Sequence, residues 1–363
     1  MTTDGRIHKN IKERYNKGIG IVNTISGLLK EMSFGHHYFE MAVLFRQSMS
    51  LNGILCNSEV LYGVNKNHIE TLESVDKYFW RKIFQCPFST PHEAYYMETN
   101  TIPIKYVLMS RRLMYFWNIL QMNEDELVKR VFNAQKIEAT KNDWVLQIKE
   151  DLQNCGIYKS EAEIKNMKHY SFRKLVREKV REAAKVYLLT MREDPNRSKS
   201  KNLWPSDEIK DYLKTNLLST AEKQLLFLMK TRMNNLKWNY KSKYKNNLDC
   251  SLCRQNVQES EAHLLQCDEL TTELSICDEM KEVKYEDIYG SLQEQVRAVK
   301  LWKRIFKIRT WKIEQRKRSP GHQVHQHTSA SSGCSTQQIV DPPSQDCDIT
   351  TSVQLLYSSD FGY

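Results

Sequence analysis

The sequence contains few residues that interrupt helices: 8 prolines and 12 glycines in 363 residues. Long uninterrupted helices are therefore permitted almost throughout the chain. No apolar run approaches the length of a membrane span and no signal peptide is recognisable, so no membrane partner is expected. The 9 cysteines form no regular framework. Together these absences predict an intracellular, reducing location. The nucleus is slightly favoured over the cytoplasm.

The sequence has fewer acidic than basic residues: 44 Asp and Glu compared with 54 Lys and Arg, which gives a formal net charge of +10. A basic chain favours a polyanionic partner such as RNA or DNA. A solvated basic surface without a dedicated partner explains the same composition. Hydrophobic residues make up 40% of the chain, enough for a core in each of two domains. No small-molecule substrate is expected.

Apolar residues recur at helical spacing, and the sequence predicts a mainly α protein. Residues 1–195 are expected to form a helical domain in which 38–63 is one long, mostly apolar helix. A polar, proline-bearing linker is expected at 196–206. Residues 207–318 follow as a basic helical region. Residues 319–363 are rich in Ser, Gln and His and poor in large apolar residues, so this tail is predicted to be disordered.

The segment "CSLCRQNVQESEAHLLQC" holds Cys250, Cys253, His263 and Cys267 in the spacing Cys-x2-Cys-x9-His-x3-Cys. A Cys-x2-Cys turn places two thiolates on one side of a metal, and a helix capped by Ser260 would place His263 and Cys267 on one face. These four ligands predict a closed, structural Zn2+ site rather than a catalytic one. Alternatively, the cysteines are small buried hydrophobes that lie close together by chance.

Residues 228–247 combine basic and aromatic side chains without any acidic residue. Lysine and arginine can neutralise phosphates, and aromatic rings can stack on unpaired bases. A solvated basic face with inward-packed aromatics is the alternative. Residues 301–318 are a further basic segment that could bind nucleic acid or serve as a nuclear import signal. The candidate nucleic-acid-binding residues are Lys230, Arg232, Lys237, Trp238, Tyr240, Lys241, Lys243 and Lys245.

Five blocks stand in collinear order between about residue 4 and about residue 311: "KNIKERYNKGIGIVNTISGLLKEMSFGHHYFEMAVLFRQSM", "LNGILCNSEVLYGV", "TPHEAYYMETNTIPIKYVLMSRRL", "DWVLQIKEDLQNCGI" and "ESEAHLLQC". With the Cys-Cys-His-Cys cluster, they resemble the polyprotein of a LINE-type (non-LTR) retrotransposon of the Dong-like clade. The resemblance implies that this chain corresponds to the thumb, connection and zinc segment of the reverse transcriptase. The family's polymerase palm is missing.

The chain contains no Asp-Asp pair, although two-metal polymerase chemistry requires paired carboxylates. No polymerase activity is therefore expected from this chain alone. The resemblance also implies an endonuclease, but the Glu-x-Lys triplets in Asp207–Lys210 and Asp278–Lys281 lack a convincing Pro-Asp companion. We expect a catalytically incomplete fragment that binds template RNA or target DNA, without catalytic residues of its own. A zinc-stapled protein-interaction module and a non-functional element remnant are the alternatives.

Overall fold

The computed structural model describes residues 4–32, 34–61, 63–137, 143–244, 247–253, 255–272 and 282–318. These residues are mostly helical, and none of them lies in a strand. This confirms the prediction of a mainly α protein. The predicted disordered tail, 319–363, lies outside the described residues. Within the described ranges, no helix combines the length and the apolar character that a membrane span requires.

The chain divides into two compact units, Met1–Thr231 (unit 1) and Arg232–Tyr363 (unit 2). This division differs from the expected linker at 196–206, because the residues after that linker still belong to unit 1. The ring of Phe227 stacks on that of Phe84 with centroids 4.0 Å apart. Gln224 Nε2 donates a hydrogen bond to the Ile83 carbonyl at 2.7 Å. These buried contacts make residues 207–231 part of the first core.

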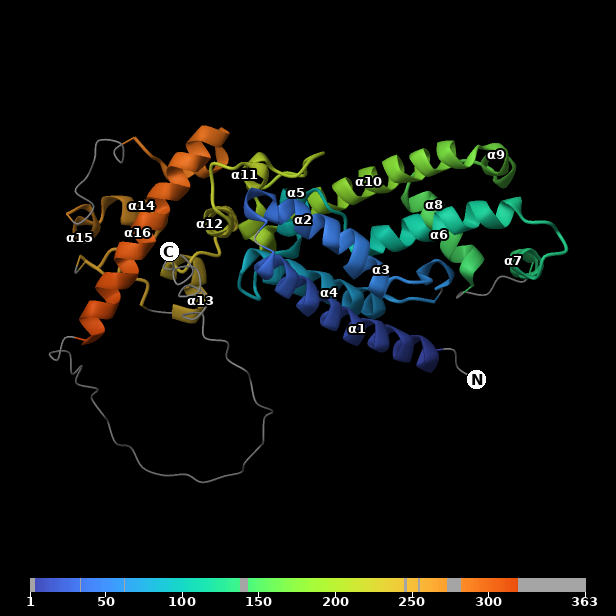
Figure 1. Cartoon of the computed structure of the whole chain (residues 1–363), viewed down its shortest axis with the longest axis horizontal. Coiled ribbons are helices and arrows are strands. Elements are labelled where there is room, and N and C mark those ends of the chain that lie inside the picture. The colour runs from blue at the N-terminus through green and yellow to red at the C-terminus, as the bar shows by residue number, and fades with distance from the viewer. Residues whose placement is uncertain are drawn as a thin grey trace, which may run out of the picture. The chain divides into compact units, whose positions relative to one another are not determined.

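Figure 1 shows the helices of both units. Those of unit 1 are α1 (Asp4–Glu31), η1 (Gly35–His37), α2 (Tyr38–Phe45), η2 (Arg46–Ser50), α3 (Leu51–Ile54), η3 (Ser58–Val60), α4 (Lys66–Phe84), α5 (His92–Thr99), α6 (Ile104–Gln121), α7 (Leu127–Ile137), α8 (Trp144–Asn154), α9 (Glu161–Asn166), α10 (His169–Glu193), η4 (Pro195–Ser200), α11 (Asp211–Lys214) and α12 (Thr220–Lys230). Those of unit 2 are η5 (Lys237–Tyr240), α13 (Lys241–Tyr244), α14 (Glu261–Gln266), α15 (Asp268–Thr271), η7 (Tyr285–Tyr289) and α16 (Leu292–Arg318).

Helix α1 packs against α3 and α4 through a position where only glycine fits. A Cβ atom added to Gly18 would lie 2.5 Å from Ile54 Cγ2 and 2.8 Å from Val75 Cγ1. Both distances are shorter than real Cβ contacts, so a side chain here would push the helices apart. The buried Val22 and Ile25 continue this contact one and two turns further along α1.

The predicted long helix at 38–63 is shorter and less uniform than expected. Helical structure runs from Tyr38 to Ile54 as α2, the π-helical turn η2 and α3. Asn57 then adopts a left-handed conformation with φ 52°, which ends the run well before residue 63. The run is also not purely apolar, because Arg46 is buried at its π turn and pairs with Asp76.

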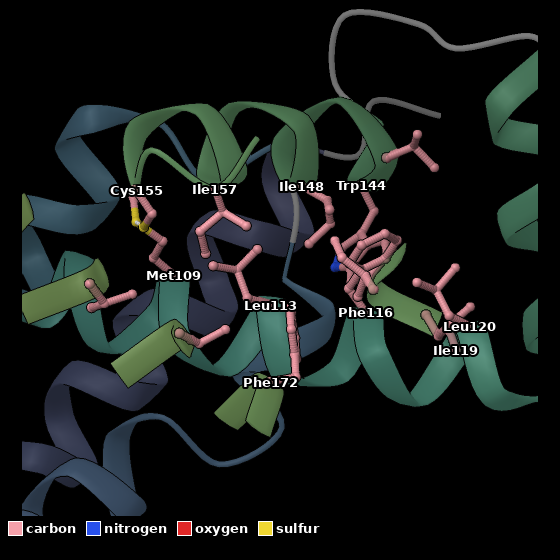
Figure 2. Packing of buried hydrophobic residues seen from close by; sticks show 14 of the residues in the cluster. Met109, Leu113, Phe116, Ile119, Leu120, Trp144, Ile148, Cys155, Ile157 and Phe172 are labelled. Atoms are coloured by element: carbon pink, nitrogen blue, oxygen red, sulfur yellow. Dashed lines mark hydrogen bonds between the residues drawn. The ribbon is translucent and has the colours of Figure 1, made fainter. Parts of the chain in front are cut away.

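A second part of the unit 1 core lies between α6, α8 and α10 (Figure 2). Phe116 from α6, Trp144 from α8 and Phe172 from α10 are all buried. A bidentate ion pair ties α6 to α8, with Arg112 Nε and Nη2 lying 2.6 and 2.9 Å from the Asp151 carboxylate. The amphipathic helix α10 therefore has one buried side, while its basic residues face outward.

The core of unit 2 is small and centres on α16. Trp302 is fully buried on this helix, and the ring of Tyr285 meets it edge to face with centroids 6.0 Å apart. Leu252, Leu264 and Leu270 are also buried. Because α14 and α15 have only six and four residues, they cannot be stable alone. These two helices therefore depend on their contacts with the rest of unit 2.

Candidate metal centre

The Cys-x2-Cys segment forms a tight hairpin in unit 2. Asp249 and Gln258 form an isolated antiparallel bridge, and Cys250 N donates to the Val257 carbonyl at 2.7 Å. Leu252 N lies 3.4 Å from Cys250 Sγ and donates to it. The hairpin thus brings the chain back after the first two cysteines toward the helix that carries the histidine. It also directs the Leu252 N–H toward the Cys250 thiol.

Helix α14 supplies the third candidate ligand and ends at the fourth. Ser260 caps the helix, because its Oγ accepts a hydrogen bond from His263 N at 3.2 Å. Cys267 is the residue after the last helical one, with extended backbone angles (φ −71°, ψ 115°). The expected Ser260 cap is confirmed, whereas Cys267 reaches the cluster from the end of the helix rather than from its face.

The three sulfurs and one imidazole nitrogen converge, since all four atoms lie within 4.8 Å of one another. Cys250 Sγ is 4.0 Å from Cys267 Sγ, and Cys253 Sγ is 3.3 Å from His263 Nε2. In a tetrahedral zinc site with bonds of about 2.3 Å, ligand atoms lie about 3.5 to 3.8 Å apart. The cysteines are free thiols, not disulfides. The cluster can therefore hold a metal ion.

Burial opposes ionisation of two of these thiols. It raises the pKa of Cys250, and it raises that of Cys267 to about 12, with the neighbouring Cys250 sulfur adding to the increase. Thiolates held this close repel one another unless a cation lies between them. A divalent metal supplies that charge and deprotonates its thiol ligands. The electrostatics of the cluster thus favour a bound cation.

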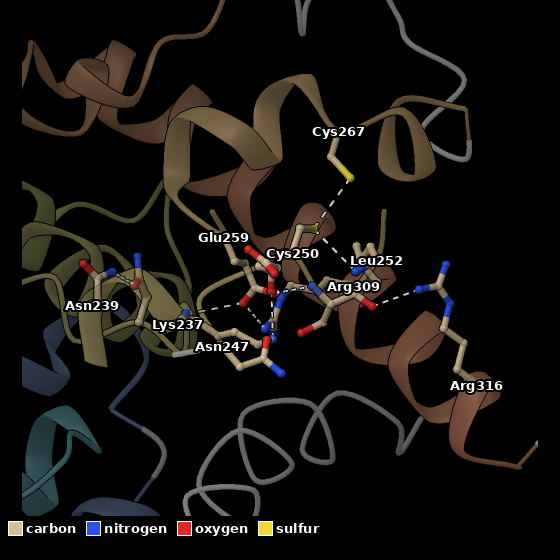
Figure 3. A network of polar contacts seen from close by, with 12 residues as sticks. Lys237, Asn239, Asn247, Cys250, Leu252, Glu259, Cys267, Arg309 and Arg316 are labelled. Atoms are coloured by element: carbon tan, nitrogen blue, oxygen red, sulfur yellow. Dashed lines mark hydrogen bonds and ion pairs between the residues drawn. The ribbon is translucent and has the colours of Figure 1, made fainter. Parts of the chain in front are cut away.

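A buried carboxylate, Glu259, holds the hairpin in place (Figure 3). Its Oε2 accepts from Ser251 N at 3.0 Å, within the Cys-x2-Cys segment. Its Oε1 lies 2.5 Å from Arg309 Nη2 of α16 and accepts from Lys237 N of η5 at 3.4 Å. One side chain therefore joins the hairpin to η5 and α16. The sequence gives no signal for this role, because glutamate before a helix cap is common.

Glu261 forms a second polar centre beside it. Its Oε1 accepts from Asn234 Nδ2 at 3.1 Å and from Asn239 Nδ2 at 2.7 Å. Both asparagines lie in the basic segment that precedes the hairpin. This segment is therefore fastened to the first turn of α14.

The structure separates the candidate nucleic-acid-binding residues. Arg232 and Lys243 are exposed. Trp238 and Tyr240 are half-buried, and the Tyr240 hydroxyl donates to the Met233 carbonyl at 3.0 Å. Lys237 Nζ donates to the Asp249 carbonyl at 2.7 Å and to Asn247 Oδ1 at 3.2 Å. Lys237 thus supports the hairpin. Lys241 lies in α13, and Lys245 lies outside the described residues.

Lys230 does not belong to an exposed surface. It is buried in unit 1, with its Nζ 3.7 Å from Glu98 Oε2 and 4.3 Å from the centroid of the Tyr212 ring. The absence of acidic neighbours in the sequence suggested solvent exposure. Its partner Glu98 is distant in sequence, so local spacing gave no indication of the pair.

Helix α16 divides its basic residues between two sides. On the inner side, Lys312 Nζ lies 3.1 Å from Glu269 Oε2, and Arg316 Nη1 donates to the Ser251 carbonyl at 2.9 Å. Together with Arg309 on Glu259, these contacts attach the helix to residues 250–269, which contain the Cys-Cys-His-Cys cluster and which we call the cluster module. On the outer side, a second set of residues is exposed at intervals of three and four: Arg297, Lys300, Arg304, Lys307 and Trp311. We refer to these five residues as the outer stripe.

The candidate endonuclease triplets gain no support from their surroundings. Asp207 pairs with Lys185, and Glu208 Oε2 lies 3.0 Å from Lys214 Nζ. Both carboxylates are largely exposed. The triplet in Asp278–Lys281 lies outside the described residues. Among the residues that the structure describes, the Cys-Cys-His-Cys cluster is the one group of three or more side chains placed to hold a metal.

Comparison with protein-family models, with curated proteins and with solved structures finds no match to this chain.

Proposed function

We propose that the chain binds nucleic acid through unit 2, and that its Cys-Cys-His-Cys cluster holds a structural zinc ion. The observation that supports this proposal most directly is the division of α16. One side of the helix is fastened to the cluster module, and the other presents a row of exposed basic residues. A basic surface mounted on a rigid module suits a polyanionic ligand.

The donor set favours zinc over other metals. Three thiols and one imidazole form a soft to borderline, tetrahedral ligand set, whereas calcium and magnesium prefer oxygen ligands. Four protein ligands leave no position for a reactive water, so the ion would stabilise the fold. Cys250 and Cys267 are buried, which further limits access of solvent to the ion.

The outer stripe has the spacing that a phosphate-binding helix needs. From Arg297 to Trp311 it extends for about 21 Å at the helical rise of 1.5 Å per residue. Glu314 is the single acidic residue between Arg297 and Arg318, so the local charge is strongly positive. Trp311 is 50% exposed at the end of the stripe, where its ring can stack on an unpaired base. The stripe therefore offers contacts to both the backbone and the bases of a single strand.

The resemblance to LINE-type retrotransposon polyproteins supports the same class of ligand. On this proposal, the chain is a catalytically incomplete reverse-transcriptase fragment that holds template RNA or target DNA beside a polymerase domain supplied elsewhere. The helical character of unit 1 and the convergent metal ligands are compatible with the thumb, connection and zinc segment of such a polyprotein.

The outer stripe is tested by replacing Arg304 and Lys307 together with Ala. Binding of a fluorescein-labelled single-stranded RNA is measured by anisotropy at several salt concentrations. If both residues neutralise phosphates, the slope of log K against log salt should fall by about 1.4, which is about 0.7 for each of the two phosphates. The matched control is Lys12→Ala with Lys17→Ala, which removes the same charge from exposed positions on α1.

An unchanged slope in the Arg304→Ala, Lys307→Ala variant would contradict the proposal that α16 binds nucleic acid. If the wild-type chain binds RNA no better than an unrelated protein of equal charge, the protein-interaction alternative becomes the better one. Equal reductions in the control variant would show that net charge, rather than this surface, governs the affinity.

A further inference from the structure

A groove on unit 1 gathers positive charge on a surface separate from the outer stripe of α16. It has a volume of about 420 Å³ and is lined by residues of η3, α6 and α10. Arg111 comes from α6, and Arg173 and Arg177 come from α10. Glu59 is the one acidic residue in the lining, so three guanidinium groups face a single carboxylate.

Arg111 is fixed in position without being neutralised by its hydrogen-bond partners. Its Nη2 donates to Asn52 Oδ1 at 2.8 Å, and its Nη1 donates to the Leu55 carbonyl. Both acceptors are neutral groups. The guanidinium is therefore pre-organised at the groove, where the Glu59 carboxylate offsets only part of the charge of the three arginines.

Arg173 and Arg177 differ from the lysines beside them on α10. Lys174 pairs with Glu178 at 3.9 Å, and Lys179 pairs with Glu182 at 2.8 Å. The two arginines stand four residues apart on one face of the helix and are exposed. Neither forms a hydrogen bond or an ion pair with any residue that the structure describes. Two guanidinium groups are thus available at the groove.

Neutral groups complete the lining. Ser110, Asn118 and Tyr115 contribute two hydroxyls and an amide from α6. The Tyr115 ring is held edge to face by Trp144, with centroids 5.8 Å apart and an interplanar angle of 83°. Trp144 is itself anchored through its Nε1, which donates to the Glu59 carbonyl at 2.8 Å. The groove therefore combines a fixed aromatic ring with charged and neutral donors.

We propose that this groove binds the phosphate groups of a nucleic-acid strand through Arg111, Arg173 and Arg177. Sites for free nucleotides usually present backbone N–H groups from a glycine-rich loop or a helix N-terminus. Here the three arginines lie inside helices, so their backbone N–H groups are already used and only side chains can contact the ligand. Such side-chain contacts are typical of backbone phosphates. The proposal rests on the proposed function for its ligand, but it concerns a separate surface.

The groove is tested in the full chain by replacing Arg173 and Arg177 with Ala. With a twelve-nucleotide single-stranded RNA, the salt slope should fall by about 1.4 if both residues contact phosphates. The matched control is Lys174→Ala with Lys179→Ala, which removes the same charge from the same helix and should leave the slope near the wild-type value. Circular dichroism verifies that all variants remain helical.

The outcomes separate this proposal from the proposed function. If the groove variant binds as the wild type does while the α16 variant is weakened, the groove proposal fails and the proposed function stands. If the groove variant binds RNA more weakly and the α16 variant does not, the groove proposal stands and the assignment of RNA binding to α16 fails. A third arm titrates tripolyphosphate and ATP by calorimetry. Saturable binding of either one without RNA binding, or no binding of any of these ligands, would overturn the nucleic-acid assignment of the groove.

Discussion

Unit 1 and unit 2 are both helical, yet different interactions hold them together. Unit 1 buries large aromatic side chains such as Trp80, Phe84 and Phe116 in an extended core. Unit 2 has one long helix, α16, and several short segments. Glu259, Glu261 and the Cys-Cys-His-Cys cluster connect these segments to one another. A core of this small size stabilises a fold only weakly. The comparison indicates that unit 1 folds by burial and unit 2 by cross-linking.

The buried charged side chains of the two units also differ in what they connect. In unit 1, Arg46 and Asp76 form a bidentate pair with both N–O distances at 2.6 Å, and the Tyr96 hydroxyl donates to Asp76 Oδ2 at 2.9 Å. This pair joins helices that are already packed together. In unit 2, Glu259 connects the hairpin, η5 and α16. In unit 1, loss of one buried polar group should lower the free energy of unfolding only by the value of that contact. In unit 2, removal of the proposed metal should abolish the local fold.

The largest expected effect is the loss of unit 2 structure on removal of the metal. We expect one zinc per chain, and we expect a strong chelator, Cys253→Ser or His263→Ala to remove hydrogen-exchange protection from residues 248 to 268. Structural zinc contributes about 10 to 16 kcal/mol of apparent binding energy to such modules. Amides of α4 and α6 should keep their protection, because unit 1 contains no part of the cluster.

Cys56→Ser is the matched control for the metal, since Cys56 is an exposed thiol of unit 1. This variant should retain one zinc per chain and normal exchange in both units. Purified protein without stoichiometric zinc, or unchanged exchange at 248 to 268 after chelation, would contradict the metal assignment. Loss of protection in α4 as well would show that the units do not fold independently.

An intermediate effect is expected from breaking the buried ion pair of unit 1. Asp76→Asn leaves the Arg46 guanidinium buried without a counter-charge and should lower the free energy of unfolding by about 3 to 5 kcal/mol. Hydrogen exchange of α4 amides measures this decrease. The Arg46→Met, Asp76→Leu double variant should recover most of it, because it removes both charges.

The exposed pair of Lys66 and Glu70 provides the comparison, with Nζ and Oε1 3.8 Å apart. Glu70→Gln should change the free energy of unfolding by less than about 1 kcal/mol. If Asp76→Asn costs no more than this control, the interior of unit 1 is more tolerant of charge than its burial implies.

The sequence predicted the helical class and the convergence of the Cys-Cys-His-Cys side chains because both depend on local spacing. Cys250, Cys253, His263 and Cys267 lie within one short segment, and Ser260 marks the start of the helix that presents the histidine. The side chains that hold this segment in place could not be predicted in the same way. Glu259 acquires its role from Arg309, fifty residues further along the chain, and no local pattern relates the two.

Long-range contacts also decided which basic residues are exposed. Lys230 and Lys237 belong to one basic segment of the sequence, yet Lys230 is buried beside Glu98 and Lys237 supports the hairpin. On α16 the basic residues recur at regular helical spacing on two sides of the helix, but the sequence does not indicate which side packs against the core. The division between the compact units also lies later in the chain than the expected linker, and the stacking of Phe227 on Phe84 across it has no signal in local composition.

The smallest expected effect concerns Lys223, a buried lysine that helps to hold α12 within unit 1. Its Nζ donates to the His36 carbonyl at 2.9 Å and to the Leu213 carbonyl at 2.8 Å. Burial lowers the pKa of Lys223 to about 8, although the Glu40 carboxylate acts in the opposite direction. Between about pH 8 and the usual lysine value near 10.5, the unfolded chain holds a proton that the folded chain has released.

This difference in bound protons should make the stability of unit 1 rise with pH above about 8, by no more than about 1.4 kcal/mol per pH unit for one proton. Lys223→Met removes the titrating group, so the free energy of unfolding of the wild type minus that of the variant should increase from pH 7.5 to pH 9.5. Subtraction is needed because buried Cys86 and Tyr38, whose pKa values burial raises to about 11 and about 12, oppose the trend equally in both proteins. Urea denaturation at three pH values measures the difference. Parallel curves would mean that the two carbonyls keep the ammonium charged throughout this range, and that Lys223 links α12 to the rest of unit 1 as a cation.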